Sequence, residues 1–261
     1  MSIISILIPK GGTGKTMTSI NLAAALQQRG QKVLLVDMDP QANMSQALGI
    51  DDDRGDVFIM ELEKAMNEEA SDISNAIVNT RSGLSLVPSS RDMSRIDYEL
   101  VGTYRGEETL KRLIGPVQHR YDFIFIDCPS AWNQLTQNAV VASDFVLMPL
   151  QAETLPAKGI ESFYKNLEEF KRKNNSISVT MDVLGLVLTK YDEKKKINRS
   201  TARKLLETHS DKLFDTRIRW SSQLANAQSA GLDIFSFNQR STGAKDYDNL
   251  AVEFLHKFND R

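Results

Sequence analysis

The chain has 261 residues, of which 41% are hydrophobic and 25% are charged, with a formal net charge of −2. This length and apolar fraction allow a sizeable buried core and favour one domain over residues 1–261. A single cysteine, Cys128, excludes an internal disulfide and a cysteine-cluster metal site, as is typical of a cytoplasmic protein. No apolar run is long enough to span a membrane, and the first one is too short and lacks the basic residues of a signal peptide.

Short apolar runs alternate along the chain with longer amphipathic ones. Buried strands are predicted over 3–8, 32–37, 84–88, 121–127, 144–150 and 182–190. Helices are predicted over 15–29, 56–69, 91–100, 107–114, 133–142, 156–173, 198–208 and 242–258. Alternation on this scale predicts an α/β fold, with a mostly parallel twisted sheet flanked by helices on both faces.

A glycine-rich segment follows the first predicted strand and leads into the first helix, and its sequence is Pro9-Lys10-Gly11-Gly12-Thr13-Gly14-Lys15-Thr16. Its glycines let backbone N–H groups approach an anion closely, and the helix N-terminus adds partial positive charge. Lys15 is placed to neutralise the β- and γ-phosphates of a nucleotide, and the Thr16 hydroxyl to bind Mg²⁺. The segment therefore predicts a nucleotide site, although Pro9 stands where the common phosphate-loop pattern has glycine.

The stretch from Lys10 to Thr16 resembles the deviant Walker A motif, K-G-G-x-G-K-[ST], of the ParA/MinD family of P-loop ATPases, and within it the ParA/Soj type. The resemblance implies ATP and Mg²⁺ as ligands and a homodimer that sandwiches two nucleotides. It also implies that Lys10 reaches the phosphates of the other subunit and acts in catalysis with Lys15. Family members often have Asn-Gln at Ile8-Pro9, and a second threonine at Met17 beside the α-phosphate.

Two acidic motifs follow the second and fourth predicted strands. The first, Asp37-Met38-Asp39-Pro40-Gln41, is similar to the family motif D-x-D-P-Q-x-N. The resemblance implies that Asp39 orients the attacking water and belongs to the metal site together with Thr16 and Asp127. Asp37 is interpreted mainly as a carboxylate that caps the following loop or braces the phosphate loop.

The second motif is a Walker B pattern in which four apolar residues precede Asp127, which is predicted to bind Mg²⁺ directly or through water. Family members usually have a second proline where Ser130 follows Pro129. Cys128, the next residue, is predicted to be a small core residue rather than a reactive thiol.

The segment Thr189-Lys190-Tyr191-Asp192 resembles the T-K-x-D guanine-recognition motif of related GTPases. ParA-like proteins carry a variable segment near adenine at this place. Lys190 and Asp192 are therefore predicted to contact the base, and the phosphate loop favours ATP over GTP.

The chain from Lys190 to Lys245 has twelve Lys and Arg against six Asp and Glu, a local charge of +6 that leaves about −8 for the rest. This stretch is either a phosphate-binding surface or a solvated basic one. The candidates for DNA phosphate contacts are Lys194, Lys195, Lys196, Arg199, Arg203, Arg217, Arg219 and Arg240.

Residues 149–163 and 212–251 also resemble ParA, the former through a P-x-Q-x-E segment and the latter from a V-F-x-T-x-I strand onward. This resemblance implies non-specific DNA binding by the ATP-bound, nucleoid-associated dimer. It further implies slow ATP hydrolysis stimulated by a ParB-like partner, in the segregation of plasmid or chromosomal DNA.

Two alternatives share the same phosphate loop: a MinD-like positioning ATPase at a membrane, and a metabolic ATP-dependent ligase. The last predicted helix carries the apolar stripe Tyr247, Leu250, Ala251, Phe254, Leu255 and Phe258. Its polar face is acidic with few lysines, which favours packing on the core over binding to anionic lipid. A ligase would need further substrate-binding residues, and no glutaminase cysteine–histidine pairing is evident.

Overall fold

One continuous sheet organises the chain, and its strands lie in the order β3-β4-β2-β5-β1-β6-β7-β8. The computed structural model describes residues 1–152 and 156–259. The strands are β1 (Ser2–Ile6), β2 (Val33–Asp37), β3 (Val78–Asn79), β4 (Ser85–Val87), β5 (Phe123–Asp127), β6 (Phe145–Gln151), β7 (Asp182–Tyr191) and β8 (Leu213–Arg219). β3 pairs antiparallel with β4, and the other neighbours are parallel, which confirms the predicted fold class.

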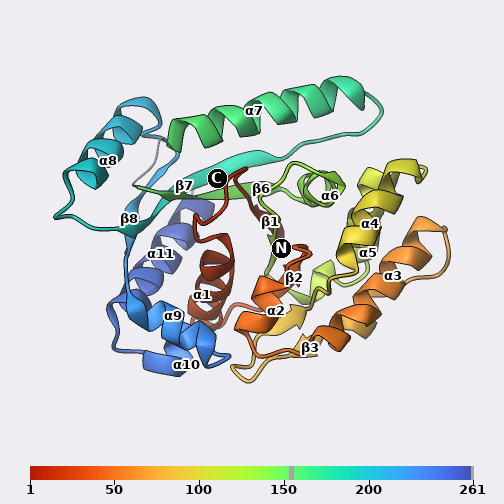
Figure 1. Cartoon of the computed structure of the whole chain (residues 1–261), viewed down its shortest axis with the longest axis horizontal. Coiled ribbons are helices and arrows are strands. Elements are labelled where there is room, and N and C mark those ends of the chain that lie inside the picture. The colour runs from red at the N-terminus through yellow and green to blue at the C-terminus, as the bar shows by residue number, and fades with distance from the viewer. Residues whose placement is uncertain (153–155, 260–261) are drawn as a thin grey trace.

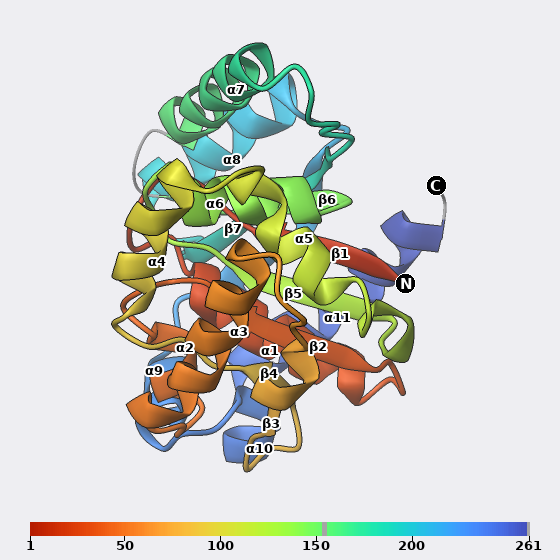
Figure 2. The same ribbon diagram turned by 90° about the vertical axis from the view of Figure 1, so that its right-hand side faces the viewer.

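Helices cover both faces of the sheet (Figure 1, Figure 2). They are α1 (Lys15–Gln27), α2 (Asn43–Ala47), α3 (Asp56–Met66), α4 (Met93–Glu99), α5 (Thr109–Ile114), α6 (Gln134–Ala142), α7 (Pro156–Lys173), α8 (Lys196–Thr208), α9 (Ser222–Ser229), α10 (Ile234–Asn238) and α11 (Thr242–Asn259). Short 3-10 turns include η3 (Leu100–Gly102) and η4 (Gly106–Glu108), which follow α4. One core contains apolar side chains of α1, α2, α9, α10 and α11, and the other those of α3 to α8.

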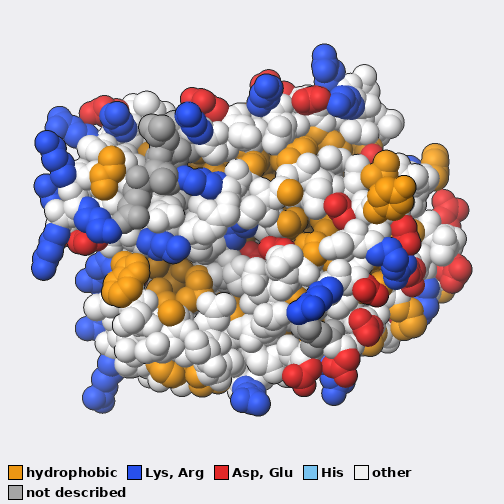
Figure 3. Space-filling model, in the orientation of Figure 1, with side chains coloured by type: hydrophobic (Ala, Val, Ile, Leu, Met, Phe, Trp, Pro, Cys, Tyr) orange, Lys and Arg blue, Asp and Glu red, His pale blue; other side chains and the backbone are white. Residues whose placement is uncertain are grey.

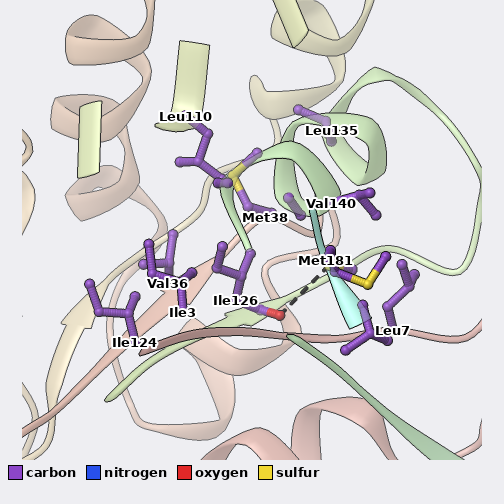
Figure 4. Close-up of a cluster of buried hydrophobic side chains, with 14 of the residues drawn as sticks. Ile3, Leu7, Val36, Met38, Leu110, Ile124, Ile126, Leu135, Val140 and Met181 are labelled. Atoms are coloured by element: carbon purple, nitrogen blue, oxygen red, sulfur yellow. Dashed lines mark hydrogen bonds between the residues drawn. The ribbon is translucent and has the colours of Figure 1, made fainter. Parts of the chain in front are cut away.

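The central strands divide their side chains between these two cores, because successive residues of a strand point to opposite faces. In β5, Phe123 and Phe125 pack with α11, whereas Ile124 and Ile126 belong to the other core. Figure 4 shows Ile124 and Ile126 beside Val36 of β2, with labelled side chains of α5 and α6 above them. This double burial explains why the strands read as uninterrupted apolar runs.

The parallel register brings three strand ends to one edge of the sheet. Ile6 of β1 and Asp37 of β2 both pair in register with Asp127 of β5. The chain places β2 to β5 on one side of β1 and β6 to β8 on the other, so the phosphate loop after β1 lies where the strand order switches. Ligands of such sheets bind at this position.

The structure extends the prediction at the edges of the sheet and in short helices. Strand β3 and the helices α2, α9 and α10 were not predicted, and β8 lies where the resemblance implies a strand. The first strand ends at Ile6, two residues before the predicted end, although the next two residues remain fully buried. Glu153, part of the P-x-Q-x-E segment, lies outside the described residues.

Candidate nucleotide site

The phosphate loop has the backbone that its glycines predict. Gly12 and Gly14 have φ values of +74° and +86°, a region that favours glycine, and Gly14 is the N-cap of α1. No acidic residue lies in the first turn of α1, so the partial positive charge of the helix end is not offset there. The Thr13 hydroxyl oxygen is buried and has no hydrogen-bond partner among the described residues. The loop therefore offers backbone and side-chain donors to an anion.

Lys15 is held within the loop at 7% exposure. Its Nζ donates to the carbonyl oxygen of Lys10 at 3.2 Å and to Ser130 Oγ at 2.7 Å. Burial lowers the pKa of Lys15 below its ordinary value, against the opposing effect of the nearby Asp127 carboxylate. Ser130, which the sequence motif did not identify as a contact residue, thus connects the Walker B loop to the phosphate loop.

Asp127 lies at the centre of a hydroxyl cluster on α1. Thr16 Oγ1 donates to its Oδ2 at 2.7 Å, and Ser19 Oγ donates to its Oδ1 at 3.1 Å. Burial, and then the charge of Asp37, raises the pKa of the Asp127 carboxyl. A hydroxyl and a carboxylate at this distance are the donor set that Mg²⁺ takes beside nucleotide phosphates. The sequence-predicted pair of Thr16 and Asp127 is therefore brought together.

Asp37 and Asp39 have different surroundings. Asp37 is fully buried, and its carboxylate accepts from Asp39 N at 3.1 Å, Ser45 N at 3.0 Å and Ser45 Oγ at 2.8 Å. It caps the loop after β2, one of the two structural roles predicted for it. Asp39 is half-buried and accepts from Gln41 N at 3.0 Å, and its charge acts on Lys15. Asp39 therefore lies within electrostatic reach of the phosphate loop.

A cavity of about 400 Å³ adjoins the phosphate loop on the side of β7 and β8. Gly12, Gly14 and Met17 form one wall, and the segment from Ile218 to Ser221 with α9 forms the other. Trp220 lines this cavity and is 68% exposed. Its apolar walls and its position beside the loop suit a nucleotide base and ribose. The sequence motifs did not predict these β8 and α9 residues.

The two residues predicted to contact the base share one cavity, but only one of them also lines the cavity beside the phosphate loop. Lys190 has φ +51° and lines both this cavity and a second one of about 940 Å³. Asp192 lines only the second, and its carboxylate accepts from Lys194 N at 3.0 Å. Thr189, in contrast, anchors the loop, because its Oγ1 donates to the Thr13 carbonyl at 2.6 Å.

The predicted DNA-contacting residues fall into three groups. Lys194, Lys195, Lys196, Arg199 and Arg203 are exposed at the start of α8 and just before it. Figure 3 shows Lys and Arg side chains gathered over the α8 end of the molecule. Arg240 is exposed between α10 and α11, and α10 lies well apart from α8 in both ribbon views (Figure 1, Figure 2).

The two arginines of β8 already have partners within the chain. Arg217 lies 4.7 Å from the centre of the Tyr191 ring and donates to its hydroxyl at 3.0 Å. Arg219 donates through Nε and Nη2 to the buried Asp246 carboxylate, at 2.6 Å for the shortest bond. These contacts fix the end of β8, which Trp220 follows directly.

Two further predictions concern burial. Cys128 is a buried free cysteine, as predicted. The apolar stripe of α11 packs on the core, with Tyr247, Leu250 and Phe254 almost fully buried, so the prediction of a core-packed helix is confirmed. Among the residues that the structure describes, none of the helices combines the length and apolar character that crossing a bilayer requires.

Comparisons with known proteins agree with this geometry. A family model described as an AAA domain matches residues 1–179. The chromosome-partitioning ATPase Soj of Treponema pallidum is 35% identical over 255 residues, covering 97% of this chain and 96% of that protein. The chromosome partitioning protein ParA of Caulobacter vibrioides is 31% identical over 263 residues, covering 100% and 96%. The structure of cobyrinic acid a,c-diamide synthase from Mycobacterium smegmatis with ADP and magnesium has a TM-score of 0.81 and 26% identity, covering 99% of this chain and 96% of that one.

Proposed function

Because the chain belongs to the ParA/MinD family of P-loop ATPases, we propose that it is a DNA-partitioning ATPase, active as an ATP-dependent homodimer. The observation that carries this proposal is the second lysine, Lys10, in a phosphate loop that also contains a buried Lys15 beside Asp127. A loop of this kind combines a phosphate site within one subunit with a second lysine that is proposed to act on the nucleotide of the other subunit.

The described residues fit ATP with Mg²⁺. The N–H groups of the loop and the unpartnered Thr13 hydroxyl are donors for phosphate oxygens, and Lys15 Nζ can exchange Ser130 Oγ for one of them. Thr16 and Asp127 would hold the metal, which when bound supplies positive charge at the phosphates. Asp39 is proposed to orient the attacking water, because its charge acts on Lys15 and its half-buried carboxylate is held in place by Gln41 N.

The base is proposed to be adenine, bound in the cavity beside Met17 and Trp220. Asp192, the carboxylate by which a T-K-x-D motif would select guanine, lines the neighbouring cavity instead. We therefore expect GTP to compete poorly with a fluorescent ATP analogue in an equilibrium titration. Competition by GTP at the same concentration as ATP would contradict this choice of base.

Lys10 is proposed to reach across the dimer to the phosphates bound by the partner. Its backbone is anchored on both sides, since Lys10 N donates to the Ile8 carbonyl at 2.7 Å and its own carbonyl accepts from Lys15. The origin of the side chain is thereby fixed, and a cation on the γ-phosphate would make dimerisation depend on a triphosphate.

The Lys10→Ala variant tests this role. It should still bind ATP but remain monomeric by light scattering, whereas Lys32→Ala, at an exposed lysine elsewhere, should dimerise with ATP and not with ADP. An ATP-dependent dimer formed by Lys10→Ala would refute the proposed role of Lys10.

DNA binding is proposed to use the basic start of α8, here called the α8 surface and made of Lys194, Lys195, Lys196, Arg199 and Arg203. The exposed Trp220 shares a cavity with Lys194, Lys195 and Arg199, so this surface combines cations with an aromatic ring, as nucleic-acid sites do. DNA affinity should require ATP, fall steeply with salt and be independent of sequence.

A charge-matched pair of variants tests this surface. Replacing Lys194, Lys195 and Lys196 by alanine should weaken binding and lower the salt slope by about one for each DNA phosphate that is no longer neutralised. Replacing the basic run at the end of α7, Lys171, Arg172 and Lys173, removes the same charge and should leave the slope unchanged. Equal losses of affinity in both variants would mean that only net charge matters.

A ParB-like partner and a DNA cargo complete the proposal, on the strength of the ParA and Soj relatives. Turnover by the chain alone should be slow, since Lys10 must come from the second subunit. Sedimentation with anionic liposomes and ATP tests the membrane alternative, against which the burial of the α11 stripe argues. ATP consumption that requires a small carboxylic acid would instead support the ligase, a class represented among similar folds.

A further inference from the structure

Ser130 departs from the family pattern, and the proposed function assigns it no contact with the nucleotide. It follows Pro129 in the Walker B loop after β5, where family members usually have a second proline. Proline has neither a backbone N–H nor a polar side chain, whereas serine has a hydroxyl that donates one hydrogen bond and accepts others. The chain therefore carries an additional hydrogen-bonding group at the end of its Walker B motif.

The Ser130 hydroxyl lies against the phosphate loop. Its Oγ accepts from Lys15 Nζ at 2.7 Å, and a Cβ added to Gly11 would lie 3.8 Å from it, in ordinary van der Waals contact. Three residues earlier, Asp127 accepts from Thr16 at 2.7 Å, so the Walker B loop is joined to the phosphate loop at two places. Ser130 and Gly11 are both exposed, so an anion that enters the loop can reach them.

The proton of this hydroxyl has no acceptor among the residues that the structure describes. Because an N–H of Lys15 is directed at Ser130 Oγ, the Ser130 proton points away from that ammonium group. An anion that lies against Lys15 also lies beside Ser130, since the two side-chain atoms are 2.7 Å apart. Ser130 is thus a hydrogen-bond donor placed for a phosphate oxygen beside the lysine.

The position of Ser130 selects one phosphate of the nucleotide. The cavity proposed for the base lies against Gly14 and Met17, and the described residues that line it include neither Ser130 nor Gly11. A nucleotide with its base in that cavity extends across the loop to Lys15, so its last phosphate is the one farthest from the base. Ser130 lies at this far side, next to Gly11. The terminal phosphate of ATP would therefore contact Ser130, and ADP, which is one phosphate shorter, would end before it.

We propose that the Ser130 hydroxyl donates to the terminal phosphate of ATP and thereby increases the preference of the chain for ATP over ADP. The inference rests on the proposed function, and it names the group that recognises the triphosphate within one subunit, before a second subunit is bound. When ATP enters, Lys15 exchanges the Ser130 oxygen for a phosphate oxygen, and the hydroxyl turns its proton to the same phosphate. A proline at this position could make no such bond.

Calorimetric titrations of the full chain with Mg²⁺, and with either ADP or a non-hydrolysable ATP analogue, measure this preference as the ratio of the two dissociation constants. The protein is kept at a concentration at which light scattering shows a monomer, so that dimerisation does not contribute. Ser130→Ala should reduce the preference about tenfold, as expected for the loss of one hydrogen bond to a charged group. Ser130→Thr keeps the hydroxyl and should keep the preference, whereas Ser130→Pro should lose at least as much as the alanine variant.

The ratio separates this contact from the bond that Ser130 makes to Lys15 without nucleotide. Loss of that bond affects the binding of both ligands through the same lysine, so it cancels in the ratio. The matched control is Ser221→Ala, which removes a hydroxyl from the cavity proposed for the base and should leave the ratio unchanged. An unchanged ratio in Ser130→Ala or Ser130→Pro, or an equal fall in Ser221→Ala, would overturn the proposal. A chain that binds neither nucleotide would refute the proposed function as well, whereas binding of both with an unchanged ratio refutes only the role of Ser130.

Discussion

A buried carboxylate at the end of β2 provides a quantitative test of the energetics of the site. In Asp37→Asn the side chain keeps its size, and its amide oxygen can accept both bonds from Ser45. Its NH₂ group would face the N–H of Asp39, so one hydrogen bond of about 1 kcal/mol is lost. The substitution thus removes a fully buried charge and leaves the shape of the loop intact.

The magnitude follows from the pKa of Asp37, which burial raises from 3.8 to about 6. The folded protein holds this proton to higher pH than the unfolded chain does. The contribution of Asp37 to the free energy of unfolding is therefore present at low pH and is lost as the pH rises from about 4 to about 6. Over the whole pH range this contribution to the free energy of unfolding falls by about 3 kcal/mol, and about 2 kcal/mol of that decrease occurs between about pH 4.5 and 7.5.

Urea denaturation of both proteins at these two pH values, without nucleotide and with a chelator, measures the effect. The advantage of Asp37→Asn should grow by about 2 kcal/mol from the lower to the higher pH. The lost hydrogen bond is the same at both, so it cancels in this difference. The negative charge of Asp37 also raises the pKa of Asp127, so the variant relieves that carboxyl too. Parallel pH profiles of the two proteins would refute the assignment of a raised pKa to Asp37.

Three further substitutions test other parts of the structure. Arg219→Ala leaves the buried Asp246 without its ion pair and should lower the free energy of unfolding by about 2 kcal/mol, measured by urea denaturation; a neutral result would mean that this pair is not structural. The added methyl group of Gly185→Ala would overlap an aromatic ring of β8, so the free energy of unfolding should fall by about 3 kcal/mol in the same assay. Gly102→Ala is the control, because a Cβ there meets nothing within 4 Å, and it should cause no loss. Thr13→Val removes a buried hydroxyl without a partner and should raise the melting temperature without nucleotide while weakening ATP binding by titration; a lower melting temperature would argue against an unpaired group there.

The central strands and long helices could be predicted because their burial leaves a clear pattern. β2 and β5 are apolar up to their final aspartates, and α7 occupies the predicted range of 156–173. The two-residue strand β3 could not be predicted, since its pairing with β4 is decided by the turn that joins them. α2 and α10 have five residues each and depend on tertiary contacts rather than on periodicity.

The phosphate side of the candidate site could be predicted, whereas the base side could not. Lys15, Thr16 and Asp127 lie in local motifs that follow buried strands, and register alone brings those strand ends together. The cavity proposed to hold the base is built from segments far apart in the chain, which meet because β7 pairs with β8. Trp220 belongs to no motif. Asp192, which the T-K-x-D resemblance suggested as a base contact, lines the adjoining cavity.

Packing accounts for two positions at which the chain departs from the family pattern. Ile8 is fully buried and lies against α7, where a Cβ on Gly159 would come within 3.1 Å of it. The asparagine common at this position in the family would therefore have to place its amide in an apolar core. Met17 packs partly on the other core and lines the base cavity together with Trp220.

With the base in this cavity, as proposed, Met17 would provide it with apolar contact in place of a hydroxyl at the α-phosphate. Met17→Thr should therefore bind inorganic triphosphate as well as wild type or better, while the preference for ATP over triphosphate falls, because the base loses part of its apolar wall. Competition titrations with both ligands measure that preference. A larger preference for ATP in Met17→Thr would show that Met17 does not contact the base.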